Sequence, residues 1–198
     1  MSAQNKSKRL LEPTPWSTVG PYFSVCVKED LCVPTIAAPG VKGERVKLIF
    51  AVFDRGGECV PDTLIEIWQA NADGKYNHPE DRQPKSVDGS FRGFGRQVTG
   101  LDGTCEFETI KPGRVPGPRG APQAPHLELG VFTRGVLKRL ATRMYFAGEA
   151  TNDECPVLAL VPKARRGTLL AQPVASRPGA WRHEIHLSGT NETVFFDV

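Results

Sequence analysis

The sequence predicts an all-β protein, an antiparallel β-sandwich with an extended N-terminal arm, long loops and one or two short helices. Its apolar runs are short and rich in Val, Ile and Phe, which favours strands over helices. Its 20 Gly and 17 Pro residues fall between those runs and act as turn signals. Strands separated by turns at such short spacing are typical of sandwich folds.

The chain divides into three parts, which are a mobile tail at 1–13, an arm and loop at 14–44, and a β-sandwich domain at 45–198. In the arm, Pro15 and Pro21 disfavour a helix. The segment "TPWSTVGPYFSV" is too apolar for a free tail, so we expect it to lie in a groove on this chain or on a partner. Residues 26–44 are predicted to form a loop.

Strand patterns then follow in order along the domain, at 45–54, 63–70, 95–110 (a hairpin), 126–132, 142–147, and in the two closing segments "WRHEIHLSG" and "TVFFDV". A short helix is predicted at 152–161, capped by Asn152 or Asp153. The polar loop at 71–93 is long for a compact domain, and such loops are usually functional.

Several functions are excluded by composition. The net charge is +3 and the basic residues are scattered, so no nucleic-acid surface is predicted. The sequence has no apolar stretch of about 18 residues and no leader-like segment, so no membrane span is expected. Five Cys without a CxxC pair predict free thiols in a reducing cytoplasm. The "HEIH" segment lacks the spacing of a zinc protease, and His183 and His186 should be surface residues on opposite strand faces.

The stretch "APHLELGVFTRG" at 124–135 poses a sharper question. On a strand, His126 and Glu128 point to the same face, because side chains alternate. Such a pair can bind a metal, or it can belong to a solvated face. Tyr76 and Arg134 are the other candidate functional residues, and each of them also has an ordinary packing or surface explanation.

Six motifs, taken together and in order, resemble the intradiol ring-cleaving dioxygenases. They are "TPWSTVGPYF", "VPDTLIEIWQANADGKY", "GFGRQVTGLDGTCEFETIKPG", "QAPHLELGVFTRG", "LATRMYFAGE" and "ETVFFDV". The resemblance covers the chain from about residue 14 onward. It implies an antiparallel β-sandwich and a non-haem Fe(III) bound by two Tyr and two His.

The iron-binding motif of this family is incomplete here. Tyr76 matches the first Tyr ligand and His126 the first His, whereas Val115 and Glu128 stand at the other two ligand positions. A valine cannot bind a metal, and the other two Tyr of the chain belong to other motifs. The resemblance therefore predicts no metal and no catalytic residue in this chain alone. A three-ligand site of Tyr76, His126 and Glu128 is the weaker alternative.

The resemblance further implies that the chain is the alpha subunit of a large heteromeric enzyme, inactive on its own, whose partner beta subunit binds the Fe(III). The complex would cleave protocatechuate with O2 to 3-carboxy-cis,cis-muconate. The residues that this chain would add to the partner's substrate pocket are Thr18, Val19, Gly20, Pro21, Tyr22 and Arg134. A guanidinium at position 134 suits an anionic substrate, and an interface salt bridge is the equal alternative for it.

Two other functions compete with this hypothesis. The chain could be a self-sufficient intradiol dioxygenase acting on catechol or hydroxyquinol, although it lacks the full ligand set and the length for the extra helical domain of those relatives. It could also be a sandwich-type binding or assembly module that has lost all catalysis.

Overall fold

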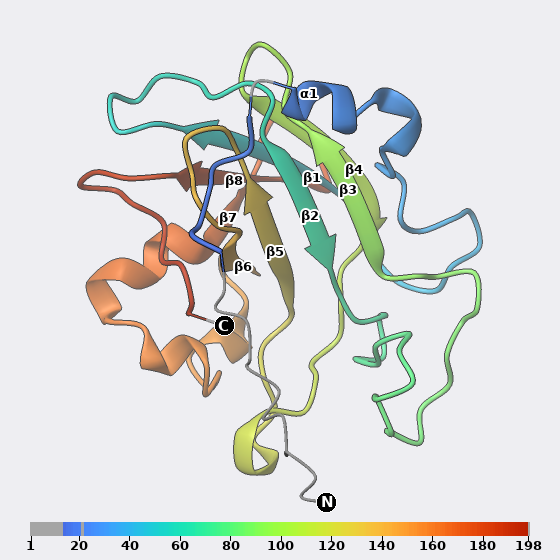
Figure 1. The fold of residues 1–198 in the computed structure, drawn as a ribbon. Helices are drawn as coiled ribbons and strands as arrows, with labels where there is room; N and C mark the ends of the chain where they lie inside the picture. The colour runs from blue at the N-terminus through green and yellow to red at the C-terminus, as the bar shows by residue number, and fades with distance from the viewer. Residues whose placement is uncertain (1–13, 21, 198) are drawn as a thin grey trace, which may run out of the picture.

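The computed structural model describes residues 14–20 and 22–197 (Figure 1). Eight strands lie within that part of the chain: β1 Arg45–Phe53, β2 Leu64–Trp68, β3 Phe94–Val98, β4 Thr104–Ile110, β5 His126–Phe132, β6 Leu140–Phe146, β7 Leu170–Pro173 and β8 Ala180–His186. The helical segments are short: α1 Phe23–Cys26, and the 3-10 turns η1 Glu29–Leu31, η2 Pro118–Gly120, η3 Ala150–Asn152, η4 Leu158–Leu160 and η5 Lys163–Leu169. No helix among these is long and apolar enough to cross a membrane.

The strands form a single curled sheet in the order β3-β2-β5-β6-β7-β8-β1-β4. Figure 1 shows this sheet with the turns of residues 150–169 on one side and the loop 71–93 on the other. The prediction of a mostly β-strand protein is confirmed. A purely antiparallel sandwich is not, because β6 pairs with β7 and β1 pairs with β8 in parallel.

Apolar side chains from both ends of the sheet order meet inside the curl. Phe50, Phe107, Leu127 and Met144 come from four different strands and are fully buried in one cluster. A second, smaller cluster packs the turns of residues 150–169 against Tyr145 of β6. Burial of this apolar surface is the main force that holds the sheet closed.

Residues 33–37 close the gap between the two edge strands β3 and β4. Val33 makes an isolated bridge to Arg96 of β3 and Thr35 one to Glu108 of β4, so the segment links the two edge strands through its backbone. Its Ile36 side chain lies in the core. Gly95 permits this approach, since a Cβ there would lie 2.6 Å from Ile36 Cδ1 and 2.9 Å from the Val33 carbonyl oxygen. Residues 26–44 were predicted to form a loop, and the structure adds to that loop the turn η1 and these isolated bridges.

Three further predictions need correction. The strands of the 95–110 segment do not pair with each other, because β3 hydrogen-bonds to β2 and β4 to β1. The 152–161 segment forms 3-10 turns rather than one helix, and Glu149, which accepts from the Thr151 N–H, caps the first turn in place of Asn152 or Asp153. In the predicted "TVFFDV" strand, the described residues 193–197 make a bridge between Phe196 and Ala141 and form no strand.

His183 is a core residue, not the surface residue that the sequence suggested. It is 2% exposed, and its ring meets Phe50 edge-on at a centroid distance of 6.0 Å. Its Nε2 has no hydrogen-bond partner among the described residues. Burial lowers the pKa of His183 to about 4, because an imidazolium would lose its hydration there.

The closure by residues 33–37 predicts a strong effect from one side chain and a weak effect from its neighbour. Ile36→Ala should lower the free energy of unfolding by about 2 to 4 kcal/mol, through lost burial and the cavity left behind. Thr35→Ala is the matched control, because Thr35 pairs through its backbone and its side chain is exposed. It should cost less than about 1 kcal/mol. Urea unfolding measures both, and equal losses would contradict this role of the segment.

Buried His183 predicts a loss of stability in mild acid. The unfolded chain binds this proton near the ordinary pKa of about 6.5, whereas the folded protein binds it only near pH 4. The contribution of His183 to the free energy of unfolding is therefore constant above pH 6.5. It falls as the pH decreases, by about 2 kcal/mol between pH 6.5 and 5. Urea unfolding across this range should show the slope in the native protein and much less of it in His183→Leu. An unchanged slope in the variant would assign it to other groups.

Candidate functional site

One row of side chains across strands β2, β5 and β6 forms the centre of the candidate site. Trp68 of β2 pairs with Glu128 of β5, and Glu128 in turn pairs with Arg143 of β6. Residues paired across a sheet project from the same face. The row therefore brings an aromatic ring, a carboxylate and a guanidinium together on that face.

Glu128 and Arg143 form the dominant interaction of this row. Arg143 Nη2 lies 2.5 Å from Glu128 Oε1, and both side chains are largely shielded from solvent. Arg143 Nη1 also donates to Gln123 Oε1 at 2.8 Å and to the Tyr145 hydroxyl at 3.3 Å. Burial works to raise the pKa of the Glu128 carboxyl, but the adjacent Arg143 guanidinium outweighs it, so that pKa lies below its ordinary value.

Arg143 was missed in the sequence, although a signal for it existed. Its motif "LATRMYFAGE" predicts a strand but does not by itself show which residue of a neighbouring strand Arg143 faces. Pairing that strand with "HLELGVF" as an antiparallel neighbour, in the register that β5 and β6 adopt, sets Arg143 opposite Glu128. An acid and a base at directly opposed positions would then have predicted the ion pair.

His126 lies beside this pair and is 3% exposed. Its Nδ1 is 2.7 Å from the Ala124 carbonyl oxygen, and because a carbonyl only accepts, Nδ1 must carry a proton. In the neutral ring Nε2 then has no proton, so it makes no hydrogen bond to Glu128 Oε1, which lies 3.4 Å away. The expectation that His126 and Glu128 share a face is confirmed by this distance.

Tyr76 enters the site from the loop that follows β2. Its ring stacks on Trp68 at a centroid distance of 5.8 Å with the planes nearly parallel. Burial raises the pKa of Tyr76 to about 12, and the negative charge of Glu128 adds to the effect. The side chain is therefore a neutral phenol at physiological pH.

Val115 is buried and lines the same hollow as Tyr76 and Trp68, with a volume of about 530 Å³. Tyr76 and Val115 thus line one hollow. Tyr76 also stacks on Trp68, which pairs with Glu128 of β5, the strand that carries His126. Within residues 14–20 and 22–197, no three His, Cys, Asp or Glu side chains gather as a metal-binding cluster.

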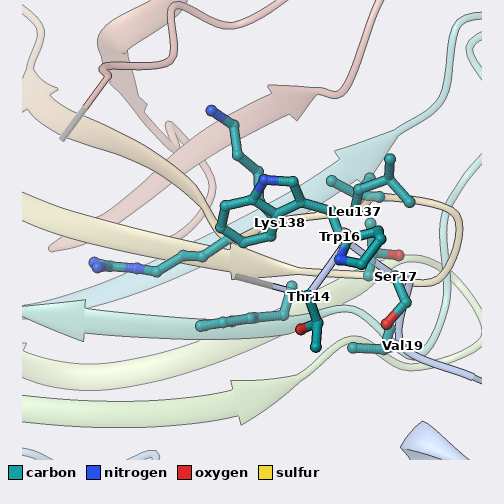
Figure 2. A pocket seen from close by; sticks show the side chains of 11 residues that line it. Thr14, Trp16, Ser17, Val19, Leu137 and Lys138 are labelled. Atoms are coloured by element: carbon teal, nitrogen blue, oxygen red, sulfur yellow. The ribbon is translucent and has the colours of Figure 1, made fainter. Parts of the chain in front are cut away.

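The N-terminal arm lies at a second hollow, of about 740 Å³, at the other end of β5. Figure 2 shows Thr14, Trp16, Ser17 and Val19 of the arm and Leu137 and Lys138 of the β5–β6 connection around it. The Thr18 hydroxyl accepts a hydrogen bond from the Gly135 N–H at 2.8 Å. Trp16 and Tyr22 remain mostly exposed. Pro21 lies outside the described residues.

Arg134 follows directly on β5 and lies beside the arm. It precedes Gly135, whose N–H binds Thr18, so this turn anchors the arm. Arg134 Nη2 is 3.4 Å from Asp62 Oδ2, and both side chains are about half exposed. The arm residue Thr18 and Arg134 therefore lie close together, while Tyr76, His126 and Glu128 gather at the opposite end of the strand.

Comparisons with known proteins agree with this structure. A family model described as "Dioxygenase" matches residues 19–187. A protocatechuate 3,4-dioxygenase alpha chain from Burkholderia cepacia is 42% identical over 95% of this chain and 98% of its own length. The corresponding beta chain from the same organism is 37% identical over 66% of this chain and 56% of its own length.

A solved structure shares the fold at lower sequence similarity. An intradiol ring-cleavage dioxygenase from Tetranychus urticae has a TM-score of 0.62 and 18% identity, over 91% of this chain and 98% of its own. The motifs, the curled mostly-β sheet and the family match over most of the chain agree with one another. The chain therefore belongs to the intradiol dioxygenase family.

Proposed function

We propose that this chain is the alpha subunit of a cytoplasmic protocatechuate 3,4-dioxygenase and works with a beta subunit. The complex inserts both atoms of O2 into protocatechuate and opens the ring between the two hydroxylated carbons, giving 3-carboxy-cis,cis-muconate. The observation that supports this most is the similarity to an alpha chain over almost the whole length of both proteins. The similarity to a beta chain of the same enzyme supports a related partner.

The iron of this complex belongs to the beta subunit in our proposal. Intradiol dioxygenases use a non-haem Fe(III), a hard cation that favours anionic oxygen ligands. The four positions in this chain do not suit it. Val115 has no donor atom, and the charge of Glu128 is already neutralised by Arg143 at 2.5 Å. The guanidinium supplies the positive charge that a metal would otherwise bring.

The contribution of this chain is to complete the partner's substrate pocket. The arm residues Thr18, Val19, Gly20, Pro21 and Tyr22 and the guanidinium of Arg134 form this contribution. Thr18 and Val19 support this, because the Thr18 hydroxyl accepts from the Gly135 N–H and Val19 lines a hollow with Thr133 and Val136. The exposed Tyr22 and half-exposed Arg134 are available to a second protein. Arg134 would meet the substrate carboxylate through a charge-assisted hydrogen bond.

The pocket role of Arg134 predicts a substrate-specific defect. In the co-expressed complex, Arg134→Ala should lower kcat/KM for protocatechuate about tenfold to a hundredfold, because a hydrogen bond to a charged group is lost. Inhibition by 3,4-dihydroxybenzamide, which has no carboxylate, should change little. Arg177→Ala is the matched control, since Arg177 is also exposed and paired, with Glu106. Unchanged kinetics in Arg134→Ala would remove Arg134 from the pocket.

The assignment of iron to the beta subunit predicts that Tyr76 is dispensable for metal binding. Tyr76→Phe in this chain should leave the iron content of the complex and its visible tyrosinate-to-iron absorption unchanged. Loss of iron or a shifted absorption band in that variant would place a metal in this chain. Iron and colour in the chain purified without its partner would do the same.

A further inference from the structure

Asp62 and Arg134 lie just beyond the paired ends of strands β2 and β5. The β2–β5 pairing ends with Leu64 opposite Phe132. The Thr63 hydroxyl donates to the Thr133 hydroxyl at 3.1 Å. One position further, Asp62 Oδ2 lies 3.4 Å from Arg134 Nη2. The ion pair thus joins the two bends that flank this end of the β2–β5 ladder.

The backbone of Asp62 is held in an unusual conformation. Its φ is +53°, a left-handed value that costs energy for residues other than Gly and that Asp tolerates better than most. The Asp62 N–H donates to the Thr99 carbonyl at 3.1 Å, and the Thr63 N–H donates to the Thr99 hydroxyl at 2.9 Å. Strain of this kind persists only where the surroundings fix it, and it gathers at functional sites.

The base of the Arg134 side chain is fixed as well. Thr133 and Val136 bracket a turn in which the Val136 N–H donates to the Thr133 carbonyl at 3.4 Å and Gly135 has a φ of +84°. The threonines at 63, 99 and 133, which hold both sides of the ladder, are buried. Asp62 and Arg134 therefore stand on one rigid platform, beside the point where the arm is anchored.

We infer that Asp62 is a positioning residue for substrate binding: its carboxylate holds the Arg134 guanidinium toward the carboxylate of the substrate. The inference rests on the proposed function of Arg134. Among the described residues, Asp62 is the one acidic partner of Arg134, and it contacts a single nitrogen at 3.4 Å. The remaining N–H groups of the guanidinium stay available, because Arg offers five donors in a fixed fork.

A competing role for Asp62 would have the opposite effect. If the carboxylate occupied the guanidinium in place of substrate, removing its charge would tighten substrate binding. The long, single contact and the rigid platform favour positioning, in which removing the charge weakens binding. The sign of the change in KM therefore separates the two roles.

The test uses Asp62→Asn in the co-expressed complex, because Asn keeps both the size and the left-handed backbone preference of Asp. We expect KM for protocatechuate to rise about twofold to fivefold, the range of an exposed ion pair, with kcat unchanged. Inhibition by 3,4-dihydroxybenzamide should not change. Asp62→Gly, which also accepts the left-handed backbone, should reproduce the effect.

The matched control is Asp73→Asn. Asp73 pairs with Lys42 at 2.9 Å and is 41% exposed, against 42% for Asp62. Asp73→Asn should leave KM and kcat for protocatechuate unchanged. In an Arg134→Ala background, Asp62→Asn should add no further increase in KM.

The outcomes separate this inference from the proposed function. If Arg134→Ala raises KM while Asp62→Asn does not, the pocket role of Arg134 stands and the positioning role of Asp62 fails. If Arg134→Ala changes nothing, the pocket role fails and the inference fails with it. A lower KM for protocatechuate in Asp62→Asn also overturns the positioning role. So does an increase in the inhibition constant of 3,4-dihydroxybenzamide that equals the increase in KM.

Discussion

The register in which β5 pairs with β2 and β6 is the constraint on which the rest of the structure depends. At one end of β5 it aligns Trp68, Glu128 and Arg143 in a single row. At the other end it brings Asp62 close to Arg134. A slip of one residue would turn His126 and Glu128 to the other face, so both ends of the strand depend on the same pairing.

The charged side chains at the two ends of β5 differ in their burial. At the His126 end, burial makes electrostatic pairing obligatory, and the Glu128 carboxylate is satisfied by Arg143 within the chain. At the Arg134 end, the side chains are half exposed and the arm is fastened only through Thr18. The first end is closed on itself by charge neutralisation, whereas the second leaves a half-exposed cation beside the arm, where we propose that the partner binds.

The platform under the second end is built from small hydroxyl side chains. Thr63, Thr99 and Thr133 are buried, and their hydrogen bonds tie the start of β2, the end of β3 and the end of β5 together. Buried polar networks of this kind rigidify a structure when every member is satisfied. This rigidity is what an arginine on a surface turn otherwise lacks.

Much of the fold could be predicted from the sequence, because strand composition is a local property. The prediction of β5 at 126–132 coincides with the structure, as does the shared face of His126 and Glu128. The bridges of residues 33–37 could not be predicted, since they join this segment to residues more than 50 positions away. The burial of His183 could not be predicted either. Its strand has polar residues on both faces, so the sequence pattern does not show which face meets the core.

The sequence by itself determined which donor atoms the candidate iron site lacks, because a valine at position 115 has none wherever it lies. It also determined the family, through motifs that are local in the chain. Only the tertiary structure decided what compensates the Glu128 carboxylate and what holds Arg134. Those partners, Arg143 and Asp62, are 15 and 72 positions away along the chain, and only the folded sheet brings them within reach.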